Sequence, residues 1–216
     1  MRKGQKSASK LHKNVPPDRY WRSIKENVFQ KYWHGCRFEE VGKLVESSGG
    51  TILDIGSADG VFTNEILKKS NAKQIIGIDV LKSSVDWANK HWKDPRLKFI
   101  VADAHNLPFR AGSFDAVFAL EVLEHVFEPM EVFREVKRVL KKEGYGVFLV
   151  PSDNFLFKNI VWPVWTKFRG KIWVDTHIQT YNNDFLRKMV EQIGFKVEQN
   201  KKFILGMLNV VKVRKV

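Results

Sequence analysis

The stretch TILDIGSADGVFTNEIL, residues 51–67, decides the fold of this chain. An apolar run that ends at Asp54 and Ile55 predicts a strand, and the spacing of apolar residues after Gly60 predicts a helix. Between them lies the turn GSADG, residues 56–60, whose glycines and small side chains let a ligand approach the backbone. A strand, a glycine-containing turn and a helix in this order are typical of nucleotide-binding α/β proteins.

Ala58 stands at the centre of this turn, where many such turns have glycine. A position that needs a positive φ strains an alanine by about 1 kcal/mol or more. We expect Ala58 to avoid positive φ, because its small methyl group still permits the close approach of a ligand.

Strand and helix patterns alternate along the rest of the chain. Apolar runs predict strands at 51–55, 74–79, 97–103, 114–120, 145–151, 195–200 and 202–213. Helical spacing predicts helices between them, at 61–69, 83–92, 129–141 and 182–194, the third ended by Lys141, Lys142 and Gly144. We therefore expect an α/β fold: a Rossmann-like, doubly wound, mostly parallel seven-stranded sheet with an antiparallel last strand and an N-terminal helical extension.

We expect one domain over residues 16–216, preceded by a disordered basic tail at 1–15 that is rich in lysine and serine. The domain divides into N-terminal helices at 16–48, a cofactor-binding core at 49–154, an aromatic and basic insert or lid at 155–180, and a closing helix and strands at 181–216. The basic N-terminus is not followed by an apolar signal segment, and Cys36 is the single cysteine, so we expect a cytoplasmic protein.

Charge is distributed unevenly along the chain. The net charge of +13 is the sum of +6 over residues 1–50 (11 basic, 5 acidic), −1 over 51–154 (14 and 15) and +8 over 155–216 (12 and 4). Basic flanks around a nearly neutral centre favour an anionic partner, such as RNA, a membrane surface or a phosphorylated substrate; solubility alone is the other interpretation.

Asp79 ends the second predicted strand, and its carboxylate can accept both hydrogen bonds from a ribose diol. A dinucleotide site would need Gly-x-Gly-x-x-Gly, but a pattern that starts at Gly56 meets Ala58 and Val61. The carboxylate of Asp54 beside the turn would also repel a pyrophosphate, whereas it suits a cationic ligand group. A dinucleotide is therefore disfavoured.

These residues resemble the class I S-adenosylmethionine-dependent methyltransferases, of the small ubiquinone/menaquinone-biosynthesis-like type. DIGSADG resembles the family's first motif and departs from it at Ala58. Four further blocks follow in the family's order within residues 50–200: GIDV, ADAHNLPF, FDAVFALEVLEHV and REVKRVLKKEGYGVFLVP, with FLRKMVEQIGFKVE late in the chain.

The resemblance implies S-adenosyl-L-methionine as cofactor, with S-adenosyl-L-homocysteine as product. It places Asp79 at the ribose, and it places Asp103 at the adenine amino group, which needs an acceptor. The full implied cofactor-binding set is Asp54, Gly56, Ser57, Gly60, Asp79, Val80, Asp103, Ala104 and Glu121. Tyr20 and Arg37, from the N-terminal helices, are candidates for the methionine carboxylate.

A sulfonium needs no metal to activate its leaving group, and no clustered set of histidines and cysteines predicts one. Catalysis then consists mostly of positioning, with a base needed only where the acceptor carries a proton that must leave. His125 and His177 are the candidate catalytic residues.

The insert at 155–180 interleaves aromatic residues with lysine and arginine. This composition fits several kinds of methyl acceptor. The insert can form a lid, a membrane-interfacial patch, an RNA-stacking surface or a packed helical cap. We favour a small-molecule or lipid-linked acceptor methylated at oxygen or carbon, with peripheral membrane contact as an option. The alternatives are an RNA methyltransferase and a non-catalytic cofactor-binding protein. ALEVLEH stands where methyltransferases of exocyclic base amines have an Asn/Asp-Pro-Pro-aromatic turn, which disfavours that chemistry.

Overall fold

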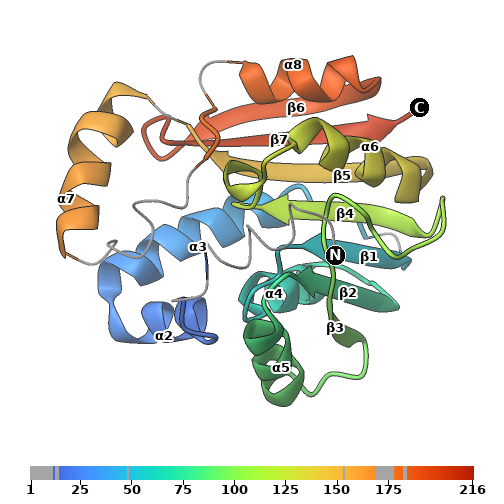
Figure 1. Ribbon diagram of the computed structural model, residues 1–216, viewed down its shortest axis with the longest axis horizontal. Helices are drawn as coiled ribbons and strands as arrows, with labels where there is room; N and C mark the ends of the chain where they lie inside the picture. The colour runs from blue at the N-terminus through green and yellow to red at the C-terminus, as the bar shows by residue number, and fades with distance from the viewer. Residues whose placement is uncertain (1–11, 13–14, 48, 153, 169–177, 182–183) are drawn as a thin grey trace.

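A computed structural model describes residues 12, 15–47, 49–152, 154–168, 178–181 and 184–216. Its strands form one seven-stranded sheet in the order β3-β2-β1-β4-β5-β7-β6 (Figure 1). Their bounds are β1 Thr51–Ile55, β2 Gln74–Asp79, β3 Leu97–Val101, β4 Phe114–Leu120, β5 Leu140–Pro151, β6 Phe195–Phe203 and β7 Leu208–Lys215.

Helices lie on both faces of this sheet (Figure 1). Their bounds are α2 Arg19–Glu26, α3 Val28–Gly42, α4 Val61–Lys69, α5 Lys82–His91, η1 Leu123–His125, α6 Pro129–Val139, η2 Phe157–Val161, α7 Trp162–Phe168 and α8 Phe185–Gln192. None of the helices in the described part of the chain has the length and apolar character needed to span a bilayer.

The central strand β1 shows why the sheet is covered on both faces. Leu53 and Ile55 pack into one core with α6 and α8, whereas Ile52 packs into another core with α3 and α4. All three side chains are almost completely buried. Consecutive residues of a strand point to opposite faces, so a strand buried on both sides needs an unbroken apolar run.

The topology confirms the predicted fold. Strands β1 to β5 pair in parallel, while β7 is antiparallel to both β5 and β6. The carboxyl ends of β1 and β4 are adjacent, and the crossovers from them run in opposite directions along the sheet. This switch point is where open α/β sheets bind ligands.

Several predicted boundaries differ from the structure, and two of the differences change the course of the chain in the sheet. Helix α6 ends at Val139, not at 141, because Leu140 already pairs with Phe114 of β4. Lys141 then bonds to the carboxylate of Asp115 at 2.9 and 2.8 Å, which holds this segment in the sheet. The expected strand at 202–213 is likewise split: residues 204–207 form the turn between β6 and β7, so only its first two residues extend β6.

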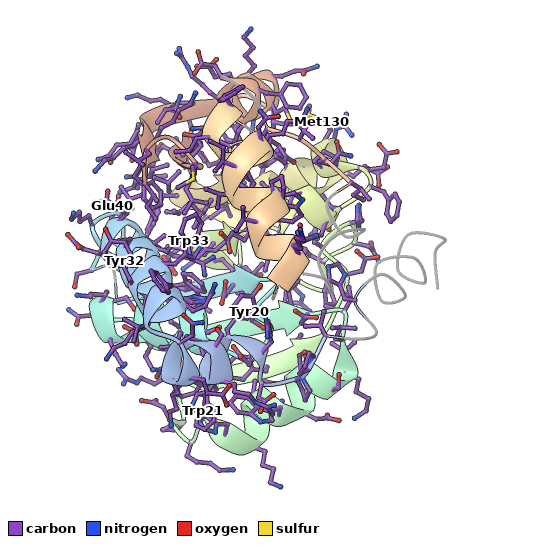
Figure 2. All side chains as sticks on the ribbon, turned by 90° about the vertical axis from the view of Figure 1, so that its left-hand side faces the viewer. Tyr20, Trp21, Tyr32, Trp33, Glu40 and Met130 are labelled. Carbon is purple, nitrogen blue, oxygen red and sulfur yellow. The ribbon has the colours of Figure 1, made fainter. Side chains whose placement is uncertain are left out.

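The N-terminal helices and the described part of the insert lie on the same side of the molecule. Helices α2 and α3 form the predicted N-terminal extension, and residues 155–168 form the helical segment of η2 and α7. Both groups stand at the left of Figure 1, and both face the viewer in Figure 2.

Candidate active site

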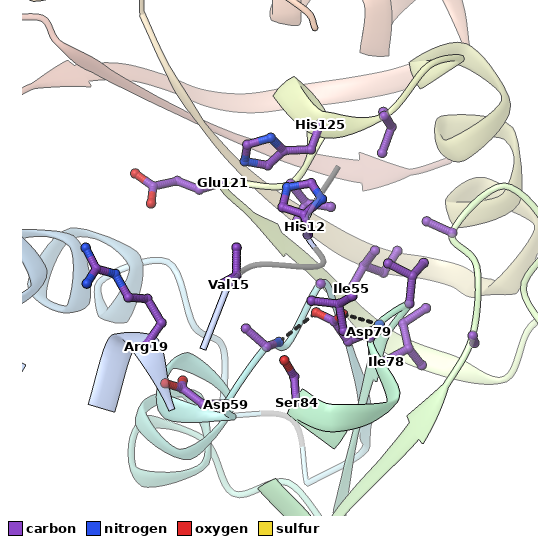
Figure 3. Close-up of a pocket in the computed structure, with 18 of the residues that line it drawn as sticks. His12, Val15, Arg19, Ile55, Asp59, Ile78, Asp79, Ser84, Glu121 and His125 are labelled. Atoms are coloured by element: carbon purple, nitrogen blue, oxygen red, sulfur yellow. Dashed lines mark hydrogen bonds between the residues drawn. The ribbon is translucent and has the colours of Figure 1, made fainter. Parts of the chain in front are cut away.

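A cavity of about 110 Å³ lies at the carboxyl ends of β1, β2 and β4 (Figure 3). The strands and their turns supply most of its floor, and the chain before α2 covers it. The residues that line it from the core include Ile55, Gly56, Ala58, Asp59, Ile78, Asp79, Val80, Ser84, Ala102, Asp103, Ala104, Glu121 and His125. His12, Val15, Pro16, Pro17, Arg19 and Tyr20 line it from the N-terminal side.

Asp79 is held in a fixed orientation at the centre of this cavity. One carboxylate oxygen accepts a hydrogen bond from the backbone N–H of Ala58 at 3.0 Å, and the other accepts from Leu81 at 2.8 Å (Figure 3). Burial raises the pKa of this carboxyl, and the two backbone donors oppose that rise. Such a carboxylate keeps further lone pairs for two hydroxyl groups of a ligand.

The expectation that Ala58 avoids a positive φ is wrong. Ala58 has φ +45°, between Gly56 at +70° and Gly60 at +76°. The chain must reverse tightly here, because the N–H groups of Gly56 and Ser57 both bond to the carbonyl of Ile78, at 2.8 and 2.9 Å. The same tight turn directs the N–H of Ala58 at Asp79, so the strained alanine keeps the bond that orients this carboxylate.

Three residues predicted to bind cofactor lie outside the cavity lining: Asp54, Ser57 and Gly60. Asp54 points toward α4, where its buried carboxylate accepts a hydrogen bond from the Thr63 hydroxyl at 2.5 Å. A Cβ at Gly60 would come within 2.6 Å of the Phe99 ring, so this glycine is needed for packing. These three residues therefore support the turn from behind.

Burial also raises the pKa of Asp54 to about 7, which the Thr63 hydroxyl opposes. The side chains of Leu53 and Ile55 occupy the opposite face of β1, so strand alternation alone turns Asp54 away from the cavity.

The remaining predicted residues lie together at the cavity: Gly56, Asp79, Val80, Asp103, Ala104 and Glu121. One oxygen of Asp103 accepts from the backbone and ring nitrogens of His105, at 3.0 and 2.7 Å. Val80, next to Asp79 in the sequence, and Ala102 and Ala104, on either side of Asp103, add apolar side chains to the lining of the cavity.

Asp59 lines the cavity as well, and sequence reasoning missed it. Its buried carboxylate accepts a hydrogen bond from the backbone N–H of Trp21 in the first turn of α2, at 2.8 Å. Burial raises the pKa of Asp59 to about 6, while backbone donors at Trp21, Val61 and Tyr20 lower it. The turn thus joins the N-terminal helices to the cavity. In the sequence, the one feature that could have pointed to Asp59 is its place directly before Gly60, where a helix starts.

A second cavity of about 280 Å³ lies between α3 and the helical segment of η2 and α7. About half of its lining residues are aromatic or aliphatic: Phe29, Tyr32, Trp33, Pro151, Phe157, Val161, Trp162 and Leu208. It shares Arg19, Tyr20, Glu121 and His125 with the first cavity. The two cavities therefore meet at these four side chains.

A buried polar cluster closes the inner end of the second cavity. Arg37, 2% exposed, forms an ion pair with Glu121 and approaches a ring nitrogen of His34 at 2.5 Å. Burial lowers the pKa of Arg37 to about 10, and burial together with Arg37 lowers the pKa of His34 to about 2. At neutral pH the arginine is therefore charged and His34 is a neutral acceptor. Burial raises the pKa of Tyr20 to about 12, so its hydroxyl stays protonated.

Glu121 occupies a strained backbone position beside this cluster. Its φ is +56°, and its N–H bonds to the carbonyl of Leu149 at 2.7 Å, which holds the residue at the end of β4. A side chain in this region costs of order 1 kcal/mol or more and is found where the surroundings fix it. Here the ion pair with Arg37 fixes the carboxylate at the junction of the cavities.

Of the two candidate catalytic histidines, His125 lies in η1 and lines both cavities. Its ring meets that of His12 edge-to-face, with centroids 4.7 Å apart. His177 lies outside the described residues. Within the described ranges, no group of three histidine, cysteine, aspartate or glutamate side chains could hold a metal ion.

The sequence and the fold of the chain are similar to those of known methyltransferases. The model of a methyltransferase domain family matches residues 53–148. A demethylmenaquinone methyltransferase of Thermotoga maritima is 29% identical over 71% of this chain and 73% of its own. A 27-O-demethylrifamycin SV methyltransferase of Amycolatopsis mediterranei is 34% identical over 59% of this chain, which spans 53% of that relative. The solved structure of an Aquifex aeolicus SAM-dependent methyltransferase shares the fold, with TM-score 0.65, 19% identity, and 97% and 98% of the two chains covered.

The fold, the switch-point cavity and the matched domain define the class of protein. The matched domain and the methyltransferase relatives support a class I S-adenosylmethionine-dependent methyltransferase. They support methyl-transfer activity with S-adenosylmethionine as the donor.

Proposed function

We propose that the first cavity holds S-adenosylmethionine, that the second holds a small-molecule acceptor, and that methyl transfer takes place where they meet. The observation that carries this proposal is the sharing of Arg19, Tyr20, Glu121 and His125 between the two cavities. A reaction that joins two ligands needs two adjoining sites with a short common wall, so that donor and acceptor are held in line.

The polar lining of the first cavity suits this donor. Its acidic members are Asp59, Asp79, Asp103 and Glu121, which favour a cationic sulfonium. In this proposal Asp79 binds the ribose hydroxyls, while Asp103 accepts from the adenine amino group with Val80 and Ala104 against the ring. Gly56 leaves room at the backbone, and Asp54, Ser57 and Gly60 act only by holding the turn.

The lining of the second cavity suits an acceptor with an apolar body and one polar group. Its aromatic wall offers burial, and its inner end offers the polar cluster of Arg37, His34 and Glu121. The bound donor supplies a methyl group on a positively charged sulfur. The protein positions the acceptor oxygen or carbon against it, and His125 takes up a proton where the acceptor carries one.

The activities for which the relatives are named agree with an acceptor of this kind. They include a demethylmenaquinone, a demethylrifamycin, a malonyl-[acyl-carrier protein] and a sterol methyltransferase. These names support a small-molecule or carrier-linked acceptor with substantial apolar surface. RNA methylation and a non-catalytic role stay predictions, and no contact between described residues favours either.

The test is binding followed by turnover. Calorimetry with S-adenosylmethionine and S-adenosylhomocysteine should give dissociation constants in the micromolar range, and no detectable binding at millimolar ligand would refute the donor site. Transfer of labelled methyl to a panel of quinols, phenols and long-chain carboxylic acids should then label one apolar class. Labelling of RNA alone would contradict the proposed acceptor.

A further inference from the structure

The opening of the second cavity is surrounded by exposed apolar side chains. Phe29 and Tyr32 line the cavity and are 85% and 70% exposed, so they stand at its mouth. Outside the lining, Val28 at the start of α3, Ile160 in η2 and Val164 in α7 are also exposed, each on an element that supplies lining residues. We call these five residues the apolar rim; no neighbouring segment among the described residues covers them.

The two segments that carry the apolar rim, residues 27–38 and 154–168, have no acidic residues. They contain the exposed lysines Lys31, Lys158 and Lys167. Helices α3 and α7, which carry parts of these segments, stand on the side of the molecule that faces the viewer in Figure 2.

From this surface we propose that the apolar rim docks on an anionic lipid bilayer, so that the second cavity opens directly into the membrane and takes an amphipathic, membrane-resident acceptor. This rests on the proposed function for the role of the second cavity. Aliphatic side chains such as Val28, Ile160 and Val164 enter the acyl boundary of a bilayer, while nearby lysines bind anionic headgroups.

Charge and side-chain type favour a bilayer over a nucleic acid. Valine and isoleucine have no flat face on which a base could stack, and they make up most of the exposed rim outside the cavity. An acceptor that lives in a membrane would also explain why an aromatic cavity opens through an apolar mouth. The apolar acceptor could then enter without crossing water.

The surface can be tested with residues that do not line either cavity. We would measure co-sedimentation of the full chain with vesicles of phosphatidylcholine alone and of phosphatidylcholine with phosphatidylglycerol. The wild-type protein should bind the anionic vesicles much more strongly. The triple change Lys31→Glu, Lys158→Glu and Lys167→Glu should lower that binding about 100-fold, since each lysine near an anionic surface contributes about fivefold.

The apolar residues need a separate variant and matched controls. Val28→Asp with Ile160→Asp and Val164→Asp should reduce binding at least 10-fold. Val216→Asp, at the exposed valine that follows β7, and Lys90→Glu on α5 should leave vesicle binding unchanged. Since the basic residues 1–15 are intact in every variant, binding that persists at the wild-type level in both triple variants would overturn the proposal.

Other outcomes separate this inference from the proposed function. Affinity for S-adenosylhomocysteine should be unchanged in all these variants, because none of the changed residues lines the first cavity. If the wild-type protein binds the donor normally but does not bind vesicles, only the proposal of a membrane-docking surface is overturned. Normal vesicle binding without donor binding would overturn the proposed function alone. Binding of single-stranded RNA, and not of vesicles, that the lysine variant abolishes would replace the bilayer by a nucleic acid.

Discussion

The two cavities are built in different ways from the same chain. The first is formed by the ends of strands and by turns, and its central carboxylate is fixed by backbone donors at Ala58 and Leu81. The second is formed by side chains of helices, and its polar end depends on the pair of Arg37 and Glu121. Substitutions of side chains leave the backbone donors of the first cavity in place, so it can keep the same ligand. The same substitutions in the helices would change which acceptor fits the second cavity.

The largest effect we predict comes from a substitution that disrupts ligand binding in the first cavity and leaves the second cavity intact. Asp79→Ala removes both acceptors for the ribose hydroxyls, and hydrogen bonds to a charged group contribute about 1.5–3 kcal/mol each. Affinity for S-adenosylmethionine should fall at least about 100-fold in calorimetry, by that arithmetic. Asp86→Ala, an exposed aspartate paired with Lys82 on α5, is the control and should bind normally. A change below threefold in Asp79→Ala would show that the ribose lies elsewhere.

The second prediction breaks the side-chain cluster. Arg37→Met leaves Glu121 without its partner, and loss of one member of a buried pair costs about 3–5 kcal/mol. Because Glu121 is partly exposed, we expect a loss near the lower end, about 3 kcal/mol in the free energy of unfolding by urea. The exposed pair of Arg187 and Glu191 is the control, and Arg187→Met should cost less than about 1 kcal/mol. Equal losses in the two variants would mean that the cluster does not hold the second cavity together.

The third prediction concerns the support behind the turn. In the folded protein the pKa of Asp54 is raised to about 7 from an ordinary 3.8, so the folded state holds a proton that the unfolded state releases. The contribution of Asp54 to stability therefore falls as pH rises from about 4 to 7. Asp54→Asn stays neutral and keeps an acceptor for Thr63.

The stability of Asp54→Asn relative to wild type should thus increase by about 2 kcal/mol between pH 5 and pH 8 in urea unfolding. Asp86→Asn, on the exposed face of α5, should show the same difference from wild type at both pH values. A pH-independent difference for Asp54→Asn as well would mean that Asp54 is ionised in the folded protein throughout this range.

The smallest predicted effect concerns Ala58. Ala58→Gly relieves the strain of φ +45° and should raise the free energy of unfolding by about 0.5–1 kcal/mol, with donor affinity nearly unchanged. Ala111→Gly, at an exposed turn alanine without positive φ, should be neutral or slightly destabilising. Destabilisation by Ala58→Gly would show that the methyl group contributes more by packing than the backbone loses by strain.

The contrast between the cavities also explains what the sequence could predict. Asp79 ends β2, Asp103 comes two residues after β3, and the ends of parallel strands meet at one edge. The apolar run therefore pointed to Asp79, whereas Asp103 was suggested by the family resemblance. Asp54 lies outside the cavity lining because it belongs to a strand, where alternation turns it toward Thr63. The φ of Ala58 was wrong because the constraint comes from Ile78 and Asp79 in the next strand, which local pattern does not contain.

The second cavity could hardly be predicted from the sequence. Arg37 and Glu121 come from α3 and from the end of β4, and only tertiary packing brings them together. The sequence predicted helices within residues 16–48 and left the insert at 155–180 open between a lid, a surface patch and a helical cap. It did not predict that Trp33 and Phe157 would line the same cavity. Asp59, similarly, acquires its role only when α2 docks on the turn.

The central claim is that donor and acceptor occupy adjoining cavities with their reacting atoms at the shared wall. A crystal structure of the complex with S-adenosylhomocysteine tests it most directly. We predict the ribose hydroxyls on Asp79, the adenine between Val80 and Ala104 near Asp103, and the thioether sulfur facing the opening lined by Tyr20, Glu121 and His125. A sulfur that faces away from the second cavity, or an adenosine bound among Trp33 and Phe157, would contradict the account.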